Sequence, residues 1–112
     1  MIDVYRDAVT RLSRVPGVSG ALVVEELKPD VSGTAVAALA AALFQRTAQA
    51  SETAGYRGLR SLQLDADGGH VLIAGAGELV VVALVEDDAQ IGRVRIEALR
   101  AARSLVQSAE AG

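Results

Sequence analysis

The sequence predicts an α+β fold, a three-layer sandwich in which an antiparallel sheet carries one long helix on one face and the N- and C-terminal helices on the other. Apolar residues recur at helical spacing at both ends of the chain, and an Ala- and Leu-rich helical segment occupies its middle. Three short, largely apolar segments follow that middle helix and are separated by Gly-containing turns. The last two of these segments are apolar at every position, which requires helices on both faces of the sheet.

The first quarter of the chain contains one helix and one strand. Residues 2–15 form an amphipathic helix that Pro16 and Gly17 end. Residues 20–25 are short, apolar and rich in Val, as expected of a strand. Residues 27–33 contain Pro29 and predict a loop or a shortened edge strand. The side of the first helix that faces the core is expected to carry Tyr5, Ala8, Val9, Leu12 and Val15.

The middle of the chain is one long helix. Ser32 or Thr34 is available as its N-cap and Gly55 as its end, so the helix is expected over residues 34–54. Two apolar stripes run along it, where a helix that covers one sheet face normally has one. Either a second copy of the chain covers the extra stripe, or Ala side chains are simply left in water. The stripes are Val36, Leu39, Ala40, Leu43, Thr47 and Ala50, and Ala37, Ala41, Phe44 and Ala48.

The last half is a meander followed by a helix. Strands are expected around 62–65, over 70–74 and over 79–85, with turns at 67–69 and 75–78. Asp87 or Asp88 can cap a final helix over residues 91–109. Its inward set is Ile91, Val94, Ala98, Ala102 and Leu105, and its outward set is Arg93, Glu97, Arg100 and Arg103.

Length and composition exclude several classes of protein. The 112 residues fit a single domain, residues 1–112. The chain has no Cys, a net charge of −3 and 3% aromatic residues, so no thiolate chemistry and no nucleic-acid partner are expected. The longest charge-free apolar run, Val36 to Phe44, is too short to span a membrane, and the first residues do not have the pattern of a secretory signal. A cytoplasmic location is expected.

No pattern predicts catalysis, a cofactor or a metal site. His70 is the single His, and Ser19 precedes a strand instead of following one. Gly75 and Gly77 are better explained by a hairpin turn than by a phosphate-binding loop, and the acidic residues 86–88 by helix capping. Arg46 is the only charge between Thr34 and Ser51; its stem either carries the guanidinium to the surface, or the guanidinium pairs across a dimer or with a partner.

Four segments give the chain a family resemblance. They are GVSGALVVEE, TAVAALAAALFQRTAQA, GGHVLIAGAGELVVVALVE and DDAQIGRVRIEALRAARSL, and the most specific feature is Ile91-Gly92-Arg93-Val94-Arg95 at the start of the final helix. With them the chain resembles the roadblock family, also called the dynein light chain roadblock type, which includes bacterial gliding-motility regulators of a Ras-like GTPase. The family usually has a full second strand where this chain has residues 27–31.

The resemblance implies a five-stranded sheet, and a homodimer formed through the middle helix and the strand after it. It implies a regulator or binder of a small Ras-like GTPase that is not itself an enzyme, or alternatively a scaffold subunit without effect on nucleotide turnover. A small-ligand sensor or enzyme built on the same layers is a third possibility. The expected dimer interface comprises Val36, Leu39, Ala40, Leu43, Arg46, Thr47, Ala50, Leu62 and Leu64.

Overall fold

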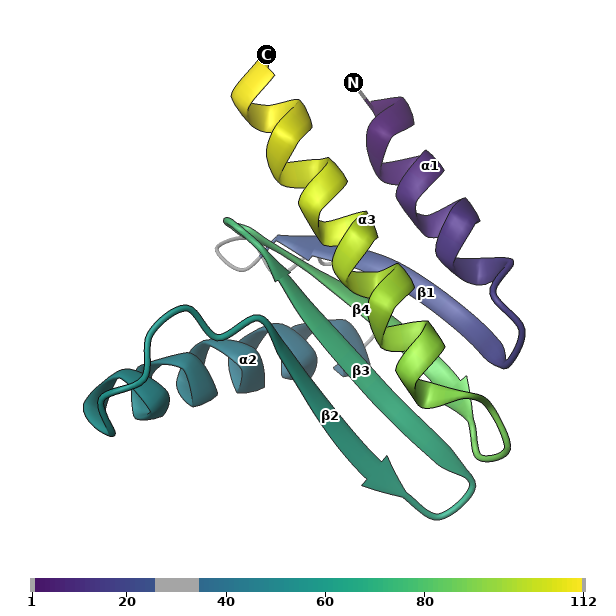
Figure 1. The fold of residues 1–112 in the computed structure, drawn as a ribbon, viewed down its shortest axis with the longest axis horizontal. Coiled ribbons are helices and arrows are strands. Elements are labelled where there is room, and N and C mark those ends of the chain that lie inside the picture. The colour runs from purple at the N-terminus through teal and green to yellow at the C-terminus, as the bar shows by residue number, and fades with distance from the viewer. Residues whose placement is uncertain (1, 26–34, 112) are drawn as a thin grey trace.

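The computed structural model describes the backbone of residues 2–25 and 35–111, and the side chains of residues 4–24 and 38–108. Figure 1 shows three helices and one sheet in these ranges. Each predicted helix and strand in the described residues is present, with ends shifted by a few residues. The elements are α1 (Ile2–Ser13), β1 (Val18–Glu25), α2 (Ala35–Thr53), β2 (Ser61–Ala66), β3 (Gly69–Ala76), β4 (Leu79–Glu86) and α3 (Ile91–Ala111).

The sheet is antiparallel and has the strand order β1-β4-β3-β2. The predicted meander of β2, β3 and β4 is confirmed, and β1 pairs with β4 on the far side. The turn predicted over residues 75–78 is shorter, because β3 continues through Ala76 and only Gly77 and Glu78 form the tip. Gly75 stays in the strand, where it pairs with Val80 and its N–H donates to the carbonyl of Arg60 at 3.0 Å.

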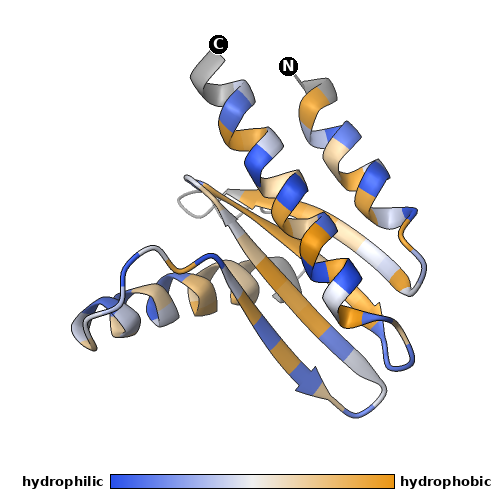
Figure 2. Ribbon diagram, in the orientation of Figure 1, coloured by the Kyte–Doolittle hydropathy of each residue, from blue (hydrophilic) through white to orange (hydrophobic). Residues whose placement is uncertain are grey.

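Helices cover both faces of the sheet, which confirms the three-layer prediction (Figure 1). On one face, Leu12 of α1 and Val94 of α3 pack with Leu72 and Val81 in a shared core. On the other face, Phe44 of α2 packs with residues of β3 and β4. Adjacent strand residues point to opposite faces, so β4 needs apolar side chains at every position from Leu79 to Val85. Figure 2 shows the central strands as mostly hydrophobic, beside the alternating colours of β2. Full burial of one Val or Leu stabilises the fold by about 1.5–3 kcal/mol.

The final helix follows its predicted pattern but not its predicted cap. Four of the five predicted inward residues are buried and Ile91 is half-buried. The carbonyl of Gln90 accepts the N–H groups of Arg93 and Val94, which places the N-cap at Gln90. The capping prediction for Asp87 and Asp88 was therefore wrong, because both residues lie in a turn, closed by the hydrogen bond from the Ala89 N–H to the Glu86 carbonyl, before α3 begins. The buried four are Val94, Ala98, Ala102 and Leu105.

Residues 26–34 lie outside the described part of the chain. The predicted loop or edge strand over 27–33, the candidate caps Ser32 and Thr34, and the fifth strand implied by the family resemblance all fall there. The described residues form a sheet of four strands.

Candidate interaction surfaces

One side of α2 packs on the sheet, and the exposure of its residues identifies that side. Ala40, Ala41 and Phe44 are each at most 6% exposed and lie in the core on this face of the sheet. Phe44 sits directly over Gly75, where an added Cβ would come within 2.7 Å of the ring. Of the residues predicted for a dimer interface, Ala40 is thus already covered by the chain's own sheet.

The flank of α2 next to Ala40 remains open. Leu39 is 68% exposed, which is a high value for a large aliphatic residue on a helix that packs on a sheet. Leu43 and Thr47 are half-buried, and the Thr47 hydroxyl donates to the Leu43 carbonyl at 2.8 Å. Arg46 and Ala50 are exposed on the same flank. The side chain of Val36, predicted for this stripe, lies outside the described residues.

Strand β2 adds an open edge to this flank. It is the last strand of the sheet as described, so one side of its backbone has no neighbouring strand there. Leu62 is half-buried and packs on the α2-side core, whereas Leu64, on the same face, is 36% exposed. Figure 1 shows α2 extending past β2, beyond the edge of the sheet. We call the open flank of α2 together with β2 the α2/β2 surface; its residues are Leu39, Leu43, Arg46, Thr47, Ala50, Leu62 and Leu64.

Arg46 is exposed, as expected if its stem carries the guanidinium to the surface. Among the described side chains it makes no ion pair. Pairing across a dimer stays a prediction.

The single His belongs to a polar network that the sequence did not predict. The Nδ1 atom of His70 lies 2.7 Å from Asp65 Oδ1, and its Nε2 atom lies 4.0 Å from Asp87 Oδ1. The Gln63 amide donates to Asp65 at 2.8 Å, and Arg95 of α3 donates to the Gln63 carbonyl oxygen. The hydrogen bonds from Gln63 and then from His70 lower the pKa of Asp65. The alternation of polar residues along β2 was the available signal for this network.

The network links α3 to the β2–β3 hairpin through side-chain hydrogen bonds, which is a structural role. Within residues 4–24 and 38–108, no group of three or more His, Asp and Glu side chains is arranged to hold a metal ion. Ser19 donates its hydroxyl to the Leu84 carbonyl at 3.2 Å, across the pairing of β1 with β4. Gly77 has φ +68° at the tip of the β3–β4 hairpin, so the hairpin-turn interpretation holds for Gly77, whereas Gly75 lies within β3.

The comparison of structures decides the fold family. The chain superimposes on MglB of Myxococcus xanthus with a TM-score of 0.85, at 14% identity over 98% of this chain and 97% of that one. The gliding protein MglB of Thermus thermophilus gives 0.80, at 18% identity over 98% and 91%. A Roadblock/LC7 domain of Streptomyces avermitilis gives 0.77, at 17% identity over 98% of each chain. The chain has the roadblock fold.

The comparisons of sequence are less informative. No family model matches the chain. An uncharacterized protein of Methanocaldococcus jannaschii is 28% identical over 102 residues, which cover 91% of this chain and 86% of that protein. The roadblock resemblance inferred from four sequence segments is thus confirmed at the level of the fold. None of the helices in the described ranges is long and apolar enough to cross a membrane.

Proposed function

We propose that this roadblock chain is a homodimeric, non-enzymatic regulator or binder of a small Ras-like GTPase. The observation that carries the proposal is the match to two bacterial MglB structures over 98% of the chain. The MglB of Thermus thermophilus is a gliding protein. The resemblance in the sequence is to gliding-motility regulators of the same family, whose partner is a Ras-like GTPase. The proposal places the protein in the cytoplasm with that partner.

The α2/β2 surface supports the homodimer. A twofold-symmetric dimer through this surface would cover the exposed Leu39 of both copies. It would also place two β2 edges against each other, so that one sheet continues across both copies and neither edge is left open. One further MglB structure, similar to this chain at a TM-score of 0.78 and 20% identity, has a tetrameric arrangement.

The non-enzymatic part of the proposal rests on the polar side chains. Both ring nitrogens of His70 face carboxylates, and the Ser19 hydroxyl is engaged with a backbone carbonyl. The sequence holds no phosphate-binding loop motif. Stimulation of a GTPase would then come from reshaping of the GTPase's own active site by the bound dimer, since positioning and electrostatics dominate phosphoryl transfer.

Two measurements test the proposal. The first is a pull-down of each Ras-like GTPase of the host, loaded with GDP or with a GTP analogue. The second is a single-turnover assay of GTP hydrolysis by each GTPase that binds. Preference for the GTP form with faster hydrolysis supports a regulator. Equal binding without a change in rate supports the alternative of a scaffold subunit. Failure to bind any GTPase of the host refutes the GTPase claim.

A further inference from the structure

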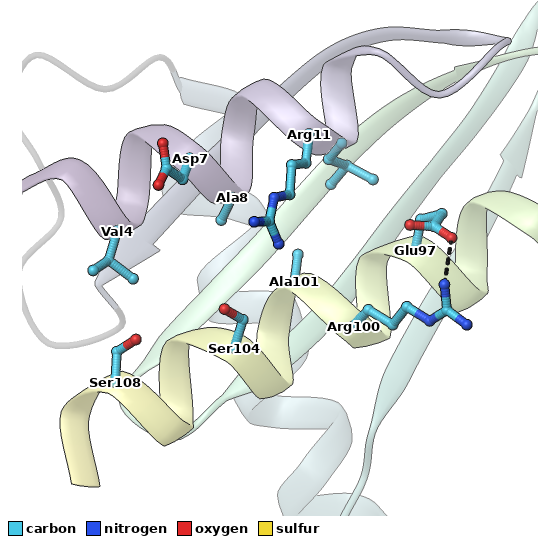
Figure 3. A pocket seen from close by; sticks show the side chains of 10 residues that line it. Val4, Asp7, Ala8, Arg11, Glu97, Arg100, Ala101, Ser104 and Ser108 are labelled. Atoms are coloured by element: carbon cyan, nitrogen blue, oxygen red, sulfur yellow. Dashed lines mark hydrogen bonds and ion pairs between the residues drawn. The ribbon is translucent and has the colours of Figure 1, made fainter. Parts of the chain in front are cut away.

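The groove between α1 and α3 carries no net charge in its lining (Figure 3). It has a volume of about 310 Å³, and Arg11 and Arg100 border it together with Asp7 and Glu97. Arg100 pairs with Glu97 at 3.2 Å. The outer edge of β2 is different, because its backbone donors and acceptors face no other strand among the described residues. The groove offers no charge for a partner to match, whereas this edge offers a row of hydrogen-bonding groups.

The hydrogen-bonding groups on the outer edge of β2 belong to alternate residues. In an antiparallel sheet, the N–H and C=O of one residue point to one side of the strand, and those of the next residue point to the other side. Arg60 directly precedes β2, and its carbonyl accepts the Gly75 N–H at 3.0 Å, so its groups point to β3. The pairing of β2 with β3 then runs without a bulge. The groups of Ser61, Gln63 and Asp65 therefore point to the open edge.

A second copy of β2 can satisfy all of these groups in one register only. A twofold axis perpendicular to the sheet makes the two β2 strands antiparallel and keeps equivalent faces together. With Gln63 opposite the partner's Gln63, these two residues exchange both hydrogen bonds, and Ser61 exchanges both with the partner's Asp65. A shift by one residue would set the free groups against groups that already bond to β3. A shift by two would leave Ser61 or Asp65 opposite a residue outside β2.

The side chains of β2 favour the same register. Leu62 packs in the core on the α2 side, and Leu64 points to the same face. In this register Leu62 lies opposite the partner's Leu64, in a pair without backbone hydrogen bonds, where side chains come closest. On the other face, the Ser61 hydroxyl lies opposite the partner's Asp65, so the two Asp65 carboxylates are kept apart. The leucines of both copies are covered, and no like charges meet.

We propose that two copies of the chain pair in this register, with Gln63 of each copy at the twofold axis and Leu62 packed against the partner's Leu64. The register rests on the proposed homodimer and specifies the contacts that would form it. A second copy is favoured over an extended segment of another protein, because its own β2 supplies the matching donors, acceptors and leucines together. Since α2 extends past β2, the added strand would lie beside this helix (Figure 1).

The sequence contains no Cys, so single Cys variants report the register directly. Leu62→Cys and Leu64→Cys chains are mixed, left to exchange subunits and treated with oxidised glutathione. A directly opposite pair has its Cα atoms about 4.5 Å apart, which a disulfide can bridge, whereas the diagonal between the two copies of Leu62 is about 7–8 Å. The mixture should therefore form a covalent dimer on a non-reducing gel, and either variant alone should give only background.

Gln63→Cys is the second test, because it should form a disulfide with itself across the axis, at a Cα separation of about 5.5 Å. The matched control is Ala66→Cys, which is exposed at the far end of β2 and should not cross-link. Circular dichroism checks the fold of each variant. If the half-buried Leu62→Cys does not fold, Gln63→Cys compared with Leu64→Cys still decides the register.

Cross-linking of Leu62→Cys alone or of Leu64→Cys alone would place that residue at the axis and overturn the register while leaving the homodimer in place. A protein that sediments as a dimer but forms no disulfide from Gln63→Cys or from the mixture would also overturn it, because the copies would then meet elsewhere. A monomeric protein would refute the homodimer and the register together. Binding to a GTPase is measured separately, so that part of the proposed function can fail independently.

Discussion

Leu39→Asp tests the proposed dimer, because the position is open in the single chain. Leu39 is 68% exposed, so a single copy should tolerate the substitution to within about 0.5 kcal/mol. In a dimer through the α2/β2 surface, burial of that exposed part contributes about 1–2 kcal/mol per copy, scaled from the value for a whole Leu. Twofold symmetry doubles the loss to about 2–4 kcal/mol, and two unpaired carboxylates in apolar surroundings add to it.

The dimer dissociation constant should therefore rise by about 100-fold or more, at 1.4 kcal/mol for each factor of ten. Sedimentation equilibrium at micromolar concentration measures it, and the thermal midpoint of the monomeric variant checks its fold. Ile96→Asp is the matched control, because Ile96 is 54% exposed on α3, across the sheet from α2. A monomeric unmodified protein, or a Leu39→Asp variant that dimerises as well as the control, would refute the assignment.

Three further predictions concern stability, each measured by urea unfolding. Phe44→Ala should destabilise the fold by about 3–5 kcal/mol, because the ring is 6% exposed over Gly75; a loss below about 1 kcal/mol would mean that α2 is not firmly packed on the sheet. Leu72→Ala should cost about 2–5 kcal/mol, since Leu72 is fully buried under α1 and α3; a loss as small as that of a surface substitution would contradict the layer assignment. Asp65→Asn should destabilise the protein at neutral pH, because the hydrogen bonds from Gln63 and His70 lower the folded-state pKa of Asp65 and so stabilise its charged form. The difference in unfolding free energy from the unmodified protein should shrink as pH falls below the ordinary pKa of 3.8, where this carboxylate becomes protonated. A difference that stays constant through acid pH would show that the network does not stabilise the charged form.

The prediction of the fold from the sequence worked where the pattern was redundant. The Gly-containing turns, the largely apolar strands β3 and β4 and the helical spacing in α3 all predicted the same arrangement of elements. The cap of α3 was mispredicted because Asp87 and Asp88 are good capping residues by type, whereas in the structure they lie in the turn after β4 and Gln90 takes the capping position.

The candidate surfaces were predicted less completely, and one ambiguity shows why. Both stripes of α2 are apolar in sequence, so periodicity alone could not say which residues meet the sheet. The structure places Ala40, Ala41 and Phe44 there, because only a residue without a Cβ, Gly75, leaves room for the Phe44 ring. Leu39 is left open as a consequence.

The sequence by itself determined the order of the elements, the number of layers and the roadblock resemblance, because these depend on local propensity and on the spacing of apolar residues along one chain. Only the tertiary structure decided which flank of α2 is free, that Gln63, Asp65, His70 and Arg95 form one network, and that arginines from the two ends of the chain border one groove. Those features depend on how elements distant in sequence pack together, as Arg95 of α3 does with Gln63 of β2, and no local pattern encodes such distances in space.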